Sequence, residues 1–328
     1  DLPVEFDEEV EAEAAKAKID LDLSQREDLR NLTCFTIDPD EARDFDDAVS
    51  ITKAEDGRRT LGVHIADVSH FVRRGSRLDR EARERGTSVY LLDRVIHMLP
   101  ERLAAEICTL APEEDRLAVS VLMQLDAAGQ LVDYQITESV IHSAGRLTYG
   151  QVESVFEQRD DDAGPALEFA DELKSMRALS SQRTAIRLKR GALDFAIGQP
   201  RVEIDAASRP IALGRYPRWE SHLLIEEFML LANECVGDFA RRRNLPVLYR
   251  IHRPPSATSL VALSGLVSSI RVELGPADEV RPRDLQLFLA GVAGRSDEAL
   301  INRLVLRAMS RAECSPEDAI HFGLACRP

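Results

Sequence analysis

The chain has 328 residues, and 44% of them are hydrophobic, which is enough to bury a core of one large domain or two ordinary ones. Its net charge of −15 argues against a broad basic surface that grips phosphates, although basic residues could still gather in one channel. No apolar run approaches the length of a membrane span, and the first residues do not resemble a signal peptide. We therefore expect a protein without membrane contact. We also expect it to be a monomer.

The cysteines are five in number, widely spaced, and form no C-x-x-C pair. Zinc ribbons and disulfide frameworks are therefore not expected, and a reducing cytoplasm is favoured. Each thiol is expected to act as a small buried hydrophobic group. The five are Cys34, Cys108, Cys235, Cys314 and Cys326.

The first third of the chain predicts a short lead-in followed by strands. Residues 1–31 are acidic and then mixed in charge, and are expected to be helical or irregular. Because the chain begins with Asp rather than Met, we expect it to be part of a longer protein. Residues 33–37 are β-like, residues 47–72 predict a hairpin around an Asp-Gly turn, and residues 79–86 predict a helix.

The rest of the chain predicts a second hairpin and then mainly helices. Early strands and later helices, without regular βαβ alternation, indicate an α+β fold. No convincing break divides the chain after the lead-in. The remaining predicted elements are a hairpin over 118–141, a helical segment over 151–190, short strands at 202–205 and 210–214, a helix over 218–243, a strand within 245–252, and helices with loops after that.

Four aspartates fall within ten positions of the segment IDPDEARDFDDAVSI, residues 37–51. Pro39 biases the residue before it toward an extended conformation, so no helix is expected there. Carboxylates gathered at the ends of buried strands repel one another unless a cation lies among them. Hard oxygen ligands suit Mg²⁺, and Mn²⁺ would satisfy the same oxygens. The four are Asp38, Asp44, Asp46 and Asp47; the alternative is a solvated acidic turn.

The predicted helix 218–243 carries a buried stripe and two adjacent glutamates. At 100° per residue, Glu227 lies at the edge of the stripe, whereas Glu226 points roughly the opposite way. A carboxylate beside a buried face must be paired, bind a metal or meet substrate. Glu227 is therefore the preferred candidate for a substrate contact, with Glu226 kept as the alternative. The stripe consists of Leu224, Phe228, Leu231, Cys235 and Phe239.

The segment HIADVSHFV, residues 64–72, invites a metal or triad interpretation through His64, Asp67 and His70. Strand alternation would place the two histidines on one face and Asp67 on the other. Polar contacts within the scaffold are therefore favoured over a convergent site.

Residues 37–48 closely resemble the signature I-D-P-x-x-A-x-D-F-D-D-A of the RNB-type exoribonuclease family, which includes ribonuclease II and ribonuclease R. Further blocks resemble the family in the same order over nearly the whole chain. They are HIADVSHFV (64–72), RGTSVYLLDRVIHMLPERL (85–103), RLTYGQV (146–152), GALDF (191–195), SHLLIEEFMLLANE (221–234), LPVLYRIHRPP (245–255) and HFGLA (321–325).

The resemblance implies an RNB catalytic domain, a mostly antiparallel sheet surrounded by helices, over residues 32–328 after the lead-in. It implies processive degradation of single-stranded RNA from the 3′ end, with Mg²⁺, to nucleoside 5′-monophosphates. Asp38 and Asp47 then correspond to the principal metal ligands, and Asp44 to a ligand that binds directly or through water. Asp46 corresponds to the carboxylate whose loss abolishes turnover while RNA still binds, and it is expected to hold either a second metal ion or the attacking water.

The resemblance also implies two substrate contacts. Tyr90 corresponds to the tyrosine that stacks near the 3′-terminal base and helps to set the length of the final product. The family's helix glutamate contacts the terminal ribose or nucleotide, and Glu227 or Glu226 would take that role.

The sequence departs from the family at three points. The S-P-I-R-R-Y motif expected after HFGLA is absent from the sequence, so its phosphate-contacting arginine is assigned to no residue. The flanking cold-shock and S1-type OB domains are likewise expected outside this chain, and the catalytic domain would lack its C-terminal end. A second family aromatic falls near Val202, where there is no ring.

Two other classes of function remain open. A non-catalytic RNA-binding module could keep the fold, although such a relative would be expected to lose one of the four aspartates. A metal-dependent phosphoesterase acting on a small molecule would suit the acidic composition, whereas Tyr90 and the helix glutamates favour a nucleotide end.

Overall fold

The structure is a computed structural model that describes residues 2–19, 21, 24–195, 200–205, 208–267 and 280–327. It divides into two compact units. Unit 1 comprises Asp1–Leu179 and Pro200–Phe228, and unit 2 comprises Ser180–Gln199 and Met229–Pro328. No helix in the described ranges is long and apolar enough to cross a bilayer.

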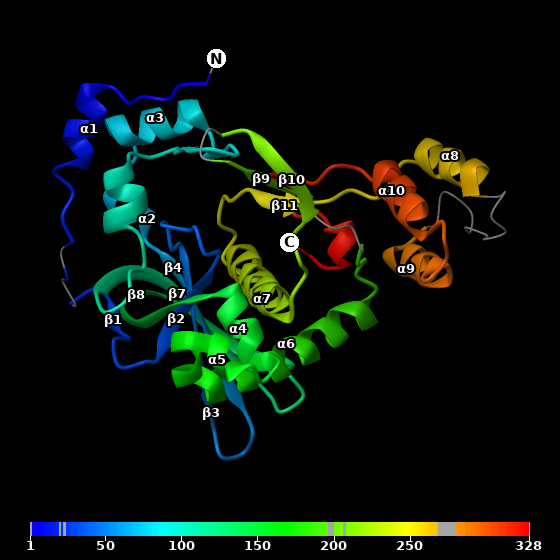
Figure 1. Ribbon diagram of the computed structural model, residues 1–328, viewed down its shortest axis with the longest axis horizontal. Coiled ribbons are helices and arrows are strands. Elements are labelled where there is room, and N and C mark those ends of the chain that lie inside the picture. The colour runs from blue at the N-terminus through cyan, green and yellow to red at the C-terminus, as the bar shows by residue number, and fades with distance from the viewer. Residues whose placement is uncertain are drawn as a thin grey trace. The chain divides into compact units, whose positions relative to one another are not determined.

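Unit 1 is built around a six-stranded sheet in the order β1-β8-β2-β3-β4-β7 (Figure 1). Strand β8 pairs with β2 and also with β7, so the ladder closes on itself. Only the pairings of β8 with β1 and β2 are parallel, and the other pairings are antiparallel. The strands are β1 (Glu27–Asp28), β2 (Cys34–Asp38), β3 (Asp47–Lys53), β4 (Arg59–Ala66), β7 (Asp115–Leu125) and β8 (Leu131–Thr148).

Both predicted hairpins are confirmed. Strands β3 and β4 pair through a turn in which Gly57 adopts φ +81°, a left-handed conformation that glycine accepts without strain. Strands β7 and β8 form the second hairpin, and β8 runs for 18 residues. Its first part pairs with β7, and its last part, from Ser143, pairs with β2.

The core of unit 1 holds apolar side chains and one chain of polar groups. Phe35, Leu61 and Leu147 are completely buried. Among them, the His64 ring lies between two hydroxyls, with Nε2 2.9 Å from Ser50 Oγ and Nδ1 2.7 Å from Ser120 Oγ. These partners satisfy a fully buried imidazole that would otherwise be costly to bury.

Helices pack on this sheet, which confirms the predicted α+β architecture of a mostly antiparallel sheet with surrounding helices. One apolar cluster joins Val10, Leu78 and Leu103 to strand residues such as Cys34 and Ile141. The helical elements of unit 1 are α1 (Glu8–Ala14), α2 (Val68–Phe71), α3 (Arg77–Arg85), the π-helical turn η1 (Arg102–Ile107), α4 (Tyr149–Phe156), α5 (Asp160–Ala163), the 3-10 turn η2 (Gly164–Phe169) and the start of α6 (Ala170–Arg190).

Two short ladders complete unit 1. Strands β5 (Val89–Tyr90) and β6 (Val95–Ile96) pair in a segment for which the sequence predicted no strand. Strands β9 (Pro200–Ile204) and β10 (Pro210–Arg215) pair where two short strands were predicted. The predicted boundary between a lead-in and a domain at residue 32 stays a prediction, although β1 already pairs with β8.

The long predicted helix is α7 (Glu220–Arg242), whose first turns belong to unit 1 and whose remainder belongs to unit 2. Leu224, Phe228, Leu231 and Cys235 are buried, and Phe239 is half-buried. The predicted apolar stripe is therefore confirmed over its first four positions.

Unit 2 is mainly helical. Phe288, Val292 and Ile301 belong to its apolar cluster. Cys314 is exposed on a short two-stranded ladder and Cys326 is half-buried, so the expectation that every cysteine is buried was wrong for these two. Its remaining elements are β11 (Tyr249–Ile251), α8 (Ala257–Val267), α9 (Pro282–Val292), α10 (Glu298–Ala308), β12 (Glu313–Ser315) and the 3-10 turn η4 (Phe322–Leu324).

Candidate active site

The four aspartates lie on and beside the loop between β2 and β3. Asp38 is the last residue of β2 and is in register with Thr148 of β8. Asp47 is the first residue of β3 and is in register with Ile65 of β4. Because both ends of the loop are fixed by strand pairing, its carboxylates occupy defined positions at one end of the sheet.

Arg146 of β8 holds the first part of this loop. Its Nη2 atom donates to the carbonyl oxygens of Pro39 at 2.7 Å and of Asp40 at 2.9 Å. The guanidinium carbon of Arg146 also lies 5.5 Å from the centre of the Phe45 ring. Arg146 is thus a positioning residue for the aspartate loop.

The second part of the loop is held through its backbone. The Phe45 amide donates to Thr109 Oγ1 at 2.8 Å, and the Phe45 carbonyl accepts from the Leu110 amide at 2.8 Å. The Asp46 carbonyl accepts from the Ala66 amide at 2.9 Å. These bonds use backbone atoms only on the loop. The carboxylates of Asp44 and Asp46, the two neighbours of Phe45, can therefore still contact a metal ion or a substrate.

The aspartates are close enough to oppose one another's ionisation. Burial raises the pKa of Asp38 to about 6; the Thr36 hydroxyl and the Arg146 charge oppose this rise, and Asp47 and Asp44 add to it. Burial and the charge of Asp46 raise the pKa of Asp47, and partial desolvation and the charge of Asp44 raise that of Asp46. A bound cation would relieve this repulsion.

The donor set suits a hard divalent cation. All four side chains offer carboxylate oxygens, and Asp38 Oδ2 is buried without a hydrogen-bond partner among the described residues. Within the same residues, no three carboxylate, imidazole or thiol groups come together as a ready-formed metal site. The assignment of Asp38, Asp44, Asp46 and Asp47 as metal ligands stays a prediction.

Tyr90 lies beside the aspartates, although it is more than 40 positions away in the sequence. The β5–β6 hairpin presents it, and its hydroxyl donates to Asp44 Oδ2 at 3.4 Å. Partial burial and the negative charges of Asp44 and Asp46 raise the pKa of this hydroxyl. Because Tyr90 as a residue is 66% exposed, its ring can receive a planar ligand next to the carboxylates.

The helix glutamates differ in burial as the stripe predicted. Glu227 is buried, with 4% exposure, whereas Glu226 is exposed. The buried position favours Glu227 as the functional group of the pair. Its contact with a terminal nucleotide stays a prediction.

Sequence reasoning missed Tyr149. This residue follows Thr148, the register partner of Asp38, and begins α4. Burial raises the pKa of the Tyr149 hydroxyl to about 12, and the charges of Asp47 and Asp38 add to the rise. The sequence did contain a signal for a helix that begins at Tyr149, because Thr148 and Gln151 form a capping box directly after a strand.

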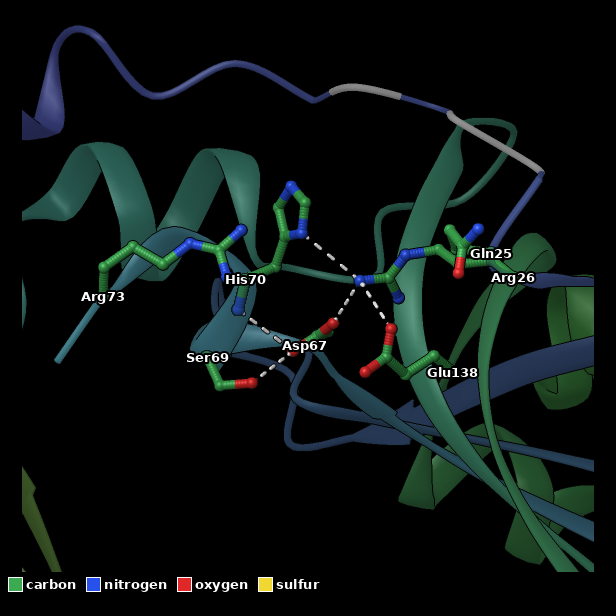
Figure 2. Close-up of a pocket in the computed structure, with 7 residues that line it drawn as sticks. All are labelled: Gln25, Arg26, Asp67, Ser69, His70, Arg73 and Glu138. Atoms are coloured by element: carbon green, nitrogen blue, oxygen red, sulfur yellow. Dashed lines mark hydrogen bonds and ion pairs between the residues drawn. The ribbon is translucent and has the colours of Figure 1, made fainter.

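The structure corrects the interpretation of Asp67 and His70. Strand β4 ends at Ala66, and Asp67 caps the following helix α2, so strand alternation does not extend to His70. Arg26 Nη2 lies 2.6 Å from Asp67 Oδ2 and 3.3 Å from His70 Nδ1 (Figure 2). Asp67 and His70 therefore meet at one guanidinium, whereas His64 lies apart between its two serines.

The family model for the RNB domain matches residues 26–327. The chain is 40% identical to ribonuclease R of Aquifex aeolicus over 332 residues, covering 99% of this chain and 46% of that protein. It is 37% identical to ribonuclease R of Escherichia coli over 300 residues, covering 92% of this chain and 37% of that protein. The chain thus spans less than half the length of these curated relatives.

Solved structures agree with the sequence comparisons. Ribonuclease R of Mycoplasma genitalium, in complex with ribose-methylated single-stranded RNA, superposes with a TM-score of 0.93 at 27% identity, covering 99% of this chain and 51% of that one. A pseudonuclease, yeast Ssd1, superposes with a TM-score of 0.73 at 18% identity, covering 94% of this chain and 38% of that one. The second likeness shows the fold alone.

Proposed function

The chain belongs to the RNB domain family, and from this premise we propose that it is the catalytic part of a 3′-to-5′ exoribonuclease. Its substrate would be single-stranded RNA, and its products nucleoside 5′-monophosphates. The observation that carries the proposal is the cluster of four aspartates at one end of the sheet, with the exposed Tyr90 ring hydrogen-bonded to one of them. A cytoplasmic location and a monomeric state are predictions from the sequence alone.

The buried Asp38 and the half-buried Asp44 and Asp47 would hold a divalent cation, with Mg²⁺ favoured and Mn²⁺ as the alternative. Asp38 and Asp47 would be the principal ligands, with Asp44 binding directly or through water. When bound, such a cation supplies charge neutralisation for the phosphate under attack and lowers the pKa of a bound water. Asp38 Oδ2 supports this assignment, because it is a buried acceptor that no described group satisfies.

The remaining residues would position the substrate. Asp46 is exposed on the loop, where its carboxylate can orient the attacking water. The Tyr90 ring would stack on the terminal base, a contact that tolerates any base. Glu227 would contact the terminal ribose, with Glu226 as the alternative.

A cleavage assay tests the proposal. Single-stranded RNA labelled at the 3′ or the 5′ end is incubated with wild type, Asp46→Asn and Asp40→Asn, with Mg²⁺ or with EDTA. Asp40 is an exposed aspartate of the same loop that lies outside the proposed ligand set, so its variant is the matched control. We expect mononucleotides from the 3′ end with wild type and Asp40→Asn, and none with Asp46→Asn or EDTA.

A non-catalytic RNA-binding module is the second candidate, because a pseudonuclease shares the fold. It would bind RNA without any metal-dependent product. Persistent cleavage by Asp46→Asn would show that the aspartate cluster is not the catalytic centre. Cleavage of a small phosphodiester without competition by RNA would indicate a phosphoesterase instead.

A further inference from the structure

Three rings form a stack that begins beside the aspartates. The Tyr149 and His222 ring centres lie 4.1 Å apart with an interplanar angle of 18°. The next pair, His222 and Trp219, lie 5.5 Å apart at 29°. Tyr149 is the inner ring, because it adjoins Thr148, the partner of Asp38. Trp219 is the outer ring, and the exposed fraction of this residue is 36%.

The stack is held by contacts of α4 and α6 with the first turn of α7. The Ser221 amide donates to Glu153 Oε2 of α4 at 3.0 Å, and both residues are buried. Glu220 accepts two bonds from Arg177, at 2.5 and 2.7 Å. His222 Nδ1 is buried and makes no hydrogen bond within the described residues, and the ring stacks on Tyr149 and on Trp219. The position of Trp219 is therefore fixed relative to Tyr149.

The segment that leads to Trp219 alternates basic and aromatic residues. It reads RYPRW, residues 215–219, and all five positions are exposed. The Arg201 guanidinium lies 5.8 Å from the centre of the Tyr216 ring, so this tyrosine is already oriented by a cation. Exposed rings interleaved with guanidinium groups are a feature of surfaces that bind single-stranded nucleic acid. In a chain with a net charge of −15, such a segment is a local exception.

We propose that residues 215–219 and the Tyr149–His222–Trp219 stack form a track along which single-stranded RNA reaches the aspartates, with a base stacked on Trp219. This rests on the proposed function, since it assigns the RNA path to the same site. Trp219 directly precedes α7 and is exposed, in contrast to Phe228 of that helix, which packs in the core with 0% exposure. Base stacking accepts every base, as degradation of RNA of any sequence requires.

Trp219 is the only tryptophan in the chain, so its fluorescence reports on this position alone. The Asp46→Asn chain is titrated with a ten-nucleotide oligo(A) RNA in Mg²⁺, and binding is followed separately through the anisotropy of a labelled RNA. We expect the emission of Trp219 to change with the same saturation curve as the anisotropy. We also expect bound RNA to protect Trp219 from quenching by acrylamide.

Further variants of the Asp46→Asn chain distinguish RNA binding at Trp219 from RNA binding elsewhere on the protein. Trp219→Ala should weaken RNA binding by at least about fivefold, because one base would lose its stacking partner. Trp219→Phe keeps an aromatic ring and should weaken binding by less than about twofold. Val132→Ala, which truncates an exposed side chain of β8, is the control and should bind as the parent does.

If RNA binds with an unchanged Trp219 signal and with equal affinity in Trp219→Ala, the track is wrong while the proposed function stands. If the Asp46→Asn parent and wild type both fail to bind RNA, the proposed function fails and the track fails with it.

Discussion

The hydroxyl of Tyr90 donates to Oδ2 of Asp44 at 3.4 Å, which joins an exposed ring to the aspartate loop. The ring belongs to the β5–β6 hairpin and the carboxylate to the β2–β3 connection. The Tyr90 ring, which would contact a base, is therefore hydrogen-bonded through its hydroxyl to Asp44, which would contact a metal. Mutation can remove the hydroxyl alone or the hydroxyl together with the ring.

Tyr90→Phe removes the hydroxyl and keeps the ring, whereas Tyr90→Ala removes both. We expect Tyr90→Phe to retain RNA affinity within about twofold, because stacking needs only the ring. Tyr90→Ala should lose about 1–3 kcal/mol of binding free energy and leave a longer final product. Gel analysis of the end product and RNA titration measure both effects. Equal end products from the two variants would exclude stacking by Tyr90.

Arg146→Ala should loosen the aspartate loop, because one guanidinium nitrogen holds two of its carbonyl groups. Hydrogen bonds from a charged donor typically contribute about 1.5–3 kcal/mol, so urea unfolding should show a loss of that order. Cleavage should fall at least about tenfold and require more Mg²⁺. Arg146→Lys keeps the charge near Asp38 and should recover part of the activity. An unchanged Mg²⁺ dependence in Arg146→Ala would argue against positioning by Arg146.

Gly62→Ala should destabilise unit 1 strongly. A Cβ atom at this position would lie within 3.0 Å of Ser50 Oγ and of His64 Nε2, inside the buried polar chain. Overpacking of a core typically costs about 1–3 kcal/mol, and here a hydrogen bond is displaced as well. Gly214→Ala is the control, since its Cβ would meet nothing within 4 Å. Thermal melts of the two variants measure the difference, and equal melting temperatures would contradict the structure.

His64 should make stability depend on pH. Burial lowers its pKa from 6.5 to about 4, so the folded imidazole stays neutral while the unfolded one takes up a proton. At this site the unfolded state then binds more protons between these values, so the contribution of His64 to stability falls as the pH drops from about 6.5 toward 4, whereas the raised pKa of Asp38 acts in the opposite direction. Between pH 7 and pH 5, this proton uptake by His64 should lower the free energy of unfolding by about 2 kcal/mol. Urea unfolding of wild type and His64→Gln at both pH values checks this, and an equal pH effect in the two proteins would count against it.

The aspartate loop could be predicted from the sequence because its four carboxylates fall within ten positions and are bounded by strand-like segments. Glu227 could be distinguished from Glu226 because a helix has a fixed angle per residue. Arg146 and Tyr149 were missed because each lies more than 100 positions from Asp38 and reaches it only through the parallel pairing of β2 with β8. No local pattern specifies which strand becomes that neighbour.

His70 was misplaced for a different reason. The apolar alternation of β4 continues in the sequence beyond Ala66, whereas the backbone turns into a helix at Asp67. The side chain of Asp67 accepts a bond from the His70 amide, and a capping aspartate of this kind ends a strand however well the alternation continues. Arg26, the partner of both residues, lies in the segment predicted as a lead-in.

The long strand β8 also has a consequence for synthesis on the ribosome. A nascent chain that has emerged only as far as β7 already exposes all four aspartates and Tyr90, but the part of β8 that pairs with Asp38 and carries Arg146 is still inside the exit tunnel. Long-range pairing closes late, because the intervening chain must be ordered first. The proposed active site would therefore be completed only after the last residues of β8 leave the exit tunnel, so the order of synthesis sets when its parts first meet.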